Sequence, residues 1–250
     1  MRIVMTTLLV AFAATVVDAQ VVLRLQHREL AGGAESRDVV VSADARRLRV
    51  DASADQSVIY DGAGQERVVL VVDHGRREYT ALNESTLRAL TAQLGPLLEQ
   101  IGRQLEGQTV PPAGTAATGT RYERTGEEAT RSGYPCEKYD VIVDGRRERE
   151  VWVTDWSNVP GSTELRGAMQ DLAAFSAELF AGLPLGGQLP ELPFETGIDR
   201  VGGFPVATIE LDAEGRPESE TVLHSAASRP IEPSVFVAPA GYAQTTFGIR

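Results

Sequence analysis

The sequence predicts a mainly β, α+β protein: a curved antiparallel half-barrel sheet with two amphipathic helices packed on its concave side. Short stretches of alternating apolar and polar residues recur along most of the chain, separated by turn signals such as Asp61-Gly62 and Asp144-Gly145. Such spacing is typical of antiparallel hairpins. Only two segments show helical periodicity, and no regular alternation of strands and helices indicates a parallel sheet.

The first part of the chain is expected to form successive strands. Residues 20–30 and 46–51 alternate apolar and polar side chains, which places one face of each strand in the core. Residues 67–72 are almost wholly apolar, so this strand is expected to be central and covered on both faces. His74 follows in an Asp-His-Gly turn and is expected to be solvated.

Strands resume after a loop rich in proline and glycine at 111–119. Residues 122–131 are polar and are expected to form an edge of the sheet. In the strand that contains Trp152, alternation points this side chain to one face and Val151 and Val153 to the other. A last hairpin is expected over residues 205–226.

Two amphipathic helices are expected near residues 87–105 and 163–181. Asn83 or Ser85 can cap the first helix, and Gly95-Pro96 should kink or split it, as a hinge or only as a kink. This helix would cover an interior that is either tightly packed or a ligand cavity. The candidate cavity residues are Leu87, Leu90, Leu94, Leu97, Ile101 and Trp152.

The first nineteen residues are expected to be a secretory signal peptide. Arg2 precedes an apolar run at 3–17, and small residues before Gln20 mark the cleavage site. The run would span only about 22 Å of the roughly 30 Å hydrocarbon core, which favours cleavage over anchoring. No cysteine follows the cleavage site for a lipid anchor. We expect a soluble periplasmic protein without stable membrane insertion, with residues 20–250 as one domain.

Composition narrows the classes of partner. The net charge of −11 argues against nucleic acids and anionic membrane surfaces, which are bound through clusters of lysine and arginine. Cys136 is the only cysteine, so an internal disulfide is excluded. It is either a small packed thiol or a redox or intermolecular disulfide site, and Lys138 could share its face.

No catalytic or metal-binding pattern stands out. The chain lacks a Gly-x-Ser-x-Gly motif, and His27, His74 and His224 lie on separate strands or turns. Their spacing suggests no zinc site, and the aspartates of turns do not form a calcium loop. We therefore expect no enzyme, no metal and no cofactor. A cleft that gathers Cys136 or a histidine beside a carboxylate would reverse this expectation.

Two segments resemble the signature of a family of uncharacterised secreted bacterial domains. The segment 133–141 reads Gly-Tyr-Pro-Cys-Glu-Lys-Tyr-Asp-Val, and 150–154 reads Glu-Val-Trp-Val-Thr, similar to the family's Gly-Tyr-x-Cys-x-x-Tyr and Val-Trp elements. A similar closing segment carries Val237, Pro239, Gly241 and Tyr242. The order of elements also resembles the LolA/LolB-like fold of periplasmic lipoprotein carriers. This resemblance implies a sheet and helices that enclose acyl chains.

Two functions are expected from these observations. The first is a non-enzymatic periplasmic protein that binds a lipid or other hydrophobic ligand in the half-barrel. The alternative is an envelope protein-interaction or stress module with a packed interior and no small-molecule ligand. The segment 182–205, rich in glycine, proline and leucine, would then serve as a docking loop for an envelope protein.

Overall fold

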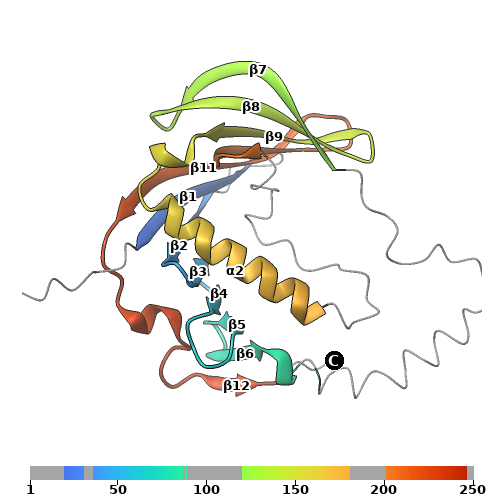
Figure 1. Cartoon of the computed structure of the whole chain (residues 1–250). Helices are drawn as coiled ribbons and strands as arrows, with labels where there is room; N and C mark the ends of the chain where they lie inside the picture. Colours follow the sequence, from blue (N-terminus) through green and yellow to red (C-terminus); the bar gives the residue numbers. More distant parts are fainter. Residues whose placement is uncertain (1–19, 31–35, 87, 89–119, 181–200, 247–250) are drawn as a thin grey trace, which may run out of the picture.

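The computed structural model describes residues 20–30, 36–86, 88, 120–180 and 201–246, and these residues form one twelve-stranded sheet with one long helix. The sheet is open and bends around the helix α2 (Ser162–Phe180) (Figure 1). The strands are β1 (Val21–Glu29), β2 (Ser36–Ala43), β3 (Arg47–Asp51), β4 (Gln56–Asp61), β5 (Val68–Asp73), β6 (Glu78–Leu82), β7 (Arg121–Arg131), β8 (Tyr134–Val143), β9 (Arg146–Thr154), β10 (Phe204–Leu211), β11 (Pro217–Ser228) and β12 (Ala243–Thr245).

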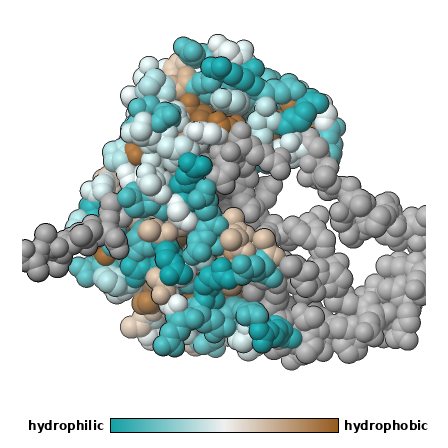
Figure 2. All heavy atoms as spheres, in the orientation of Figure 1, coloured by the Kyte–Doolittle hydropathy of each residue, from teal (hydrophilic) through white to brown (hydrophobic). Residues whose placement is uncertain are grey.

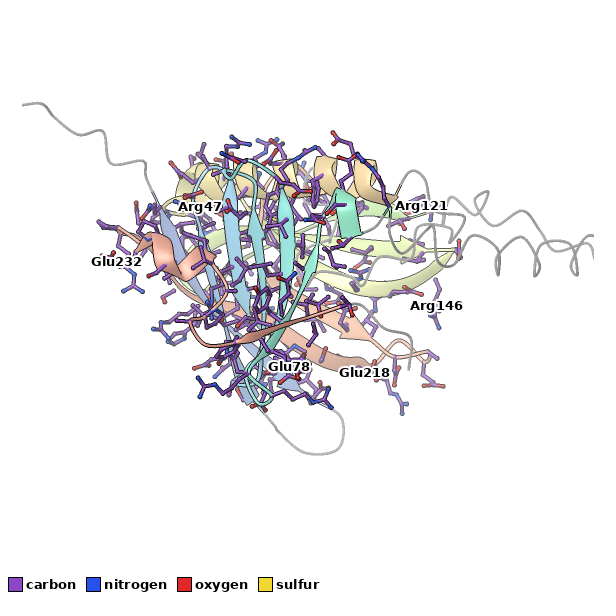
Figure 3. The ribbon with its side chains drawn as sticks, turned by 90° about the horizontal axis from the view of Figure 1, so that it is seen from below. Arg47, Glu78, Arg121, Arg146, Glu218 and Glu232 are labelled. Atoms are coloured by element: carbon purple, nitrogen blue, oxygen red, sulfur yellow. The ribbon has the colours of Figure 1, made fainter. Side chains whose placement is uncertain are left out.

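The sheet order is β12-β6-β5-β4-β3-β2-β1-β11-β10-β9-β8-β7. Two antiparallel runs, β1–β6 and β7–β11, are joined where β1 pairs with β11. Only β12 pairs in parallel, with β6, among the described strands. Charged residues lie at or next to the starts of three strands: Glu78 begins β6, Arg146 begins β9, and Glu218 follows the first residue of β11 (Figure 3). The antiparallel arrangement expected from the hairpin signals is confirmed.

Two tight turns set the register of β7, β8 and β9. Asp144 and Gly145, between β8 and β9, have φ values of 51° and 84°, as the Asp-Gly signal predicted. Ser132 and Gly133, between β7 and β8, have φ values of 50° and 84°. Both turns have positive φ at both central residues, which matches the twist of the flanking strands. The turns therefore fix which side chains of β7, β8 and β9 share a face.

The helix α2 confirms the second of the two expected helices and defines the inner face of the sheet. Its apolar stripe packs against β1, β2 and β3 and reaches Tyr60 of β4. Alternation along the strands supplies the other half of this core, with Leu23 and Val41 wholly buried. The buried apolar residues of the helix are Leu165, Ala168, Leu172 and Phe175.

The outer face of β1–β6 is covered by the end of the chain, residues 229–245, which we call the C-terminal strap. Ile231 and Phe236 of the strap pack on Ile59 and Val72 of the sheet. Phe236 is 1% exposed, and the guanidinium carbon of Arg47 lies 4.7 Å from its ring centroid. The strap ends as β12 at the β6 edge (Figure 1). The protein thus builds a second core by folding the C-terminal strap back over its first strands.

The apolar strand β5 corrects one prediction. Leu70 and Val72 are buried beneath the C-terminal strap, as expected for one face. On the inner face, Val69 is only partly buried and Val71 is 41% exposed. The strand lies beyond the part of the sheet on which α2 packs, so its inner face is not fully covered.

The start of the first expected helix lies within the described residues. Asn83 caps it: its side-chain oxygen accepts from the backbone N–H of Thr86 at 2.8 Å, and the Thr86 hydroxyl oxygen accepts from the Asn83 N–H at 2.9 Å. The rest of this segment, with Gly95-Pro96, lies outside the described residues, as do the expected signal peptide and most of 182–205. No helix among the described residues is long and apolar enough to cross a bilayer.

Candidate functional site

The inner face continues beyond α2 onto β7, β8 and β9. Four residues of these strands belong to the same apolar cluster as the helix stripe, and we call them the inner floor. They are Ala129, Tyr134, Cys136 and Trp152. Trp156 and Phe204 border the inner floor, with their rings in an edge-to-face contact at 5.6 Å. Figure 2 shows hydrophobic residues on this side of the molecule, beneath a polar upper rim.

The hairpin registers explain why these residues meet. The turn at Ser132–Gly133 pairs Arg131 with Tyr134 and Ala129 with Cys136. In the neighbouring hairpin, Lys138 pairs with Trp152. Residues directly opposite in an antiparallel pair share a face, so Arg131 and Lys138 both lie beside the inner floor.

Trp152 lies beneath these two cations. Its side chain is 2% exposed, with the Arg131 guanidinium carbon 4.5 Å and the Lys138 ammonium nitrogen 5.7 Å from its ring centroid. Cation–π contacts of this kind contribute about 2 kcal/mol when the pair is desolvated. The predicted opposite orientation of Val151 and Val153 is confirmed, since both belong to a separate cluster on the outer face.

The two cations differ in how their charge is balanced. Lys138 is paired with Glu150 at 3.1 Å and with Glu127 at 3.4 Å. Burial alone would lower the pKa of Lys138, but the hydrogen bonds to Glu150 and Glu127 outweigh burial and raise it. Arg131 makes no ion pair with any residue that the structure describes, and its guanidinium lies over the Trp152 ring.

Three buried N–H groups around the inner floor lack an acceptor within the described part of the chain. They are the Nε of Arg131 and the Nε1 atoms of Trp152 and Trp156. A fourth unpartnered atom, Asp140 Oδ1, is an acceptor. A buried donor without a partner costs about 1–3 kcal/mol. This concentration of unpaired donors distinguishes the inner floor from the packed core under α2.

Cys136 fits the packed-thiol interpretation. Its side chain is buried, and its Sγ donates to the Tyr134 carbonyl at 3.4 Å. Burial raises the pKa of the thiol, and the backbone hydrogen bond and positive charge of Arg131 oppose this only in part. A protonated, buried thiol is a poor nucleophile. Cys136 therefore serves the inner floor as a small apolar surface.

Of the candidate cavity residues, the structure describes only Trp152. Leu87, Leu90, Leu94, Leu97 and Ile101 lie outside the described residues. A depression of about 610 Å³ lies instead mainly on the outer face, beside Tyr139 and Val153. Its lining includes the Arg124–Glu137 ion pair and also Ala129 and Cys136 of the inner floor. This depression is not the space between sheet and helices that the sequence led us to expect.

His74 lies in a turn, as predicted, but it is only partly exposed and both ring nitrogens lie beside hydroxyl groups, which corrects the expectation that it is solvated. Its Nε2 lies 2.7 Å from the Ser57 hydroxyl, and its Nδ1 lies 3.0 Å from the Tyr242 hydroxyl. Ser57 is 1% exposed and donates to Asp51 at 2.5 Å. A serine nucleophile must be reachable by substrate. The arrangement instead joins β3, β4 and the C-terminal strap.

The residue that the sequence analysis missed is Arg131. It lies in a polar strand and just outside the segment 133–141 that resembles the family signature. The available signal was the Ser132-Gly133 dipeptide, a turn marker that fixes Arg131 opposite Tyr134. Among the described residues, no cluster of histidine, cysteine or carboxylate side chains could hold a metal ion.

Comparison with known proteins gives distant structural similarity alone. No protein-family model and no curated protein matches the chain. The fold is similar to an uncharacterized conserved protein from Thermus thermophilus, at 9% identity and a TM-score of 0.46 over 92% of this chain and 91% of that chain. It is also similar to the Pseudomonas aeruginosa MucA/MucB complex structure, at 12% identity and a TM-score of 0.35.

The match to the MucA/MucB complex structure covers 87% of this chain, which spans only 55% of the matched chain. A LolA superfamily protein from Nitrosomonas europaea is similar at 8% identity and a TM-score of 0.25, over 88% of this chain and 89% of that chain. The signature shared with the secreted bacterial family stays a prediction from sequence.

Proposed function

We propose that this protein is a non-enzymatic periplasmic protein that holds a lipid or other hydrophobic ligand against the inner floor. One observation carries the proposal. The apolar cluster of the inner face extends past α2 onto β8 and β9, and buried N–H donors without acceptors among the described residues surround this extension. Ligand sites are largely apolar with a few polar groups that fix orientation.

The proposal restricts the ligand to one half of the inner face. Under α2, Leu165, Leu172 and Phe175 are at most 5% exposed and pack directly on the strands. In that half the buried side chains of α2 are matched by side chains of the strands, as in an ordinary protein core, and no buried side-chain donor of α2 or of the strands beneath it lacks a partner among the described residues. The half formed by β7, β8 and β9 has the unpaired donors, so the ligand is assigned there.

Both tryptophans of the chain, Trp152 and Trp156, border this site, so intrinsic fluorescence reports on it directly. Titration of the mature chain with oleate should change tryptophan emission and saturate. Ala129→Phe fills the inner floor and should weaken binding at least about tenfold, a change of about 1.4 kcal/mol. Thr130→Phe is the matched control, because Thr130 is the exposed neighbour on the opposite face of β7.

Mass spectrometry of organic extracts provides the complementary test. Protein purified from its native envelope should carry a lipid at close to one molecule per chain, and Ala129→Phe protein should carry less. Absence of any extracted lipid, together with unchanged fluorescence on oleate titration, would contradict the proposal.

The alternative is an envelope protein-interaction module, and one observation favours it. The strand β7 is eleven residues long and forms an edge of the sheet, pairing only with β8 in the described part of the chain. Edge strands can accept an added strand from a partner. The glutamates of β7 and its register shift between Arg124 and Glu128 oppose such pairing. A stable complex with an envelope protein that forms equally with Ala129→Phe, and no bound lipid, would favour this alternative.

A further inference from the structure

We infer that Arg131 and Trp152 bind an anionic head group, a carboxylate or phosphate, of the ligand on the inner floor. This inference rests on the proposed function and names the chemical class of its ligand. Both side chains place a buried N–H donor at the same site, and neither donor has an acceptor among the described residues. A carboxylate or phosphate oxygen supplies the acceptors that these donors lack.

Charge balance supports an anion rather than a neutral polar group. Lys138 forms ion pairs with Glu127 and Glu150, whereas no described carboxylate forms an ion pair with Arg131, the other cation beside Trp152. The chain has 35 acidic and 24 basic residues, so an unneutralised, partly buried arginine is unexpected on composition alone. Desolvating a cation is costly unless an anion or several acceptors compensate.

The geometry of the pair suits a head group. The guanidinium lies over the indole face at 4.5 Å from the ring centroid, so the stacking restricts its orientation. A guanidinium held in this way presents a planar set of donors that matches two oxygens of a carboxylate or phosphate. The apolar atoms of Ala129 and Cys136 on the same face continue from this point and suit an acyl chain.

The position of Arg131 at the end of β7 places it at the boundary between floor and solvent. It is the last residue of the strand before the Ser132–Gly133 turn, and its side chain is only partly buried while its Nε is fully buried. An amphiphile would therefore bind with its charged end at the hairpin and its chain on the inner floor. Neutral esters and alcohols would leave the Arg131 charge uncompensated.

The test uses the mature full chain and compares oleate with methyl oleate by tryptophan fluorescence and calorimetry. Oleate should bind at least about tenfold more tightly than methyl oleate, and Arg131→Gln should remove most of this difference. Trp152→Phe keeps an aromatic ring and removes the N–H, so it should weaken oleate binding by a smaller factor than Arg131→Gln does. Calorimetry measures this variant. Arg124→Gln is the matched control, an arginine of the same strand that pairs with Glu137 in the outer-face depression.

The outcomes distinguish a failure of the proposed function from a failure of the inference about the head group. If neither oleate nor methyl oleate binds, the proposed function fails and the inference fails with it. If both bind equally and Arg131→Gln changes neither, the inference fails while the proposed function stands. Inorganic phosphate and acetate distinguish a head-group site from a small-anion site, because binding of either as tight as that of oleate would overturn the inference. Thermal unfolding of each variant checks that the fold is retained.

Discussion

The hydroxyl of Tyr60 donates a hydrogen bond of 2.8 Å to Asp171 and so ties strand β4 to helix α2. Tyr60 is 1% exposed, and its ring stacks on Phe175 at 5.8 Å between centroids. Burial, and then the hydrogen bond and charge of Asp171, raise the pKa of Tyr60 well above its usual value. The phenol therefore stays protonated at physiological pH, and the bond holds the helix on the inner face.

Tyr60→Phe should lower the free energy of unfolding by about 1–2 kcal/mol at pH 8, because a buried hydrogen bond to a carboxylate is lost. The pH dependence has a defined sign. Tyrosines of the unfolded chain ionise near pH 10, whereas folded Tyr60 keeps its proton, so this stabilisation is fully present below about pH 10 and declines progressively as the pH rises above it. Urea denaturation at pH 8 and pH 11 measures both effects. Identical pH slopes for wild type and Tyr60→Phe would contradict this account.

The hydrogen bond between His74 and Tyr242 should hold the C-terminal strap on the sheet. Tyr242→Phe removes the hydroxyl that lies 3.0 Å from the His74 Nδ1, at an expected cost of about 0.5–1.5 kcal/mol. In Tyr242→Phe, native-state hydrogen exchange should become faster in the strap, with a smaller change in β8 and β9. Tyr79→Phe is the control, because its exposed hydroxyl bond to Gln244 is longer, at 3.3 Å. Equal effects of the two substitutions would argue against a special role for His74.

Packing of the strap against the outer face should carry more energy than its polar contacts. Phe236→Ala removes a ring that is 1% exposed and lies beneath Arg47, and should cost about 3–5 kcal/mol in the free energy of unfolding. Val237→Ala is the neighbouring control, since Val237 is 49% exposed and should change stability by less than about 0.5 kcal/mol. A cost below about 1 kcal/mol for Phe236→Ala would show that the second core contributes little.

The fold was predictable where local chemistry determines it. Alternation placed the Trp152 side chain on the other face of its strand from Val151 and Val153, and the Asp144-Gly145 dipeptide predicted the turn between β8 and β9. Both features depend on residues that are close in the sequence. The covering of β5 was predicted less well. Its outer face is buried by Phe236, which lies more than 160 residues further along the chain, and local periodicity carries no information on such a contact.

The candidate site was predictable only in part for the same reason. Trp152 was recognised as an aromatic residue on one face of a strand, but its partner Arg131 comes from another strand through a tight turn. His74 was misjudged because its bonds to Ser57 and Tyr242 span 17 and 168 residues. Turn residues are commonly solvated, and only the tertiary arrangement shows that this one is not.

The Ser132–Gly133 turn should be needed to position Arg131. Gly133 has a φ of 84°, a region that costs other residues about 1–2 kcal/mol. Gly133→Ala should lower the free energy of unfolding by about this amount and also weaken oleate binding. Gly75→Ala is the control, because Gly75 lies in a turn of the β1–β6 half and its added methyl group meets only ordinary contacts. Loss of stability with unchanged oleate binding would show that the turn is not needed to position Arg131 for binding.

The central claim is that a hydrophobic ligand lies on the inner floor, and photocrosslinking tests it most directly. A fatty acid that carries a diazirine near the end of its chain is irradiated with the protein, and the labelled peptides and residues are identified by tandem mass spectrometry. We predict labelling of the peptides that contain Ala129, Cys136 and Trp152, with loss of labelling when oleate is added in excess. Labelling confined to outer-face side chains of the depression, such as Glu137 and Tyr139, or labelling that excess oleate does not reduce, would contradict the account.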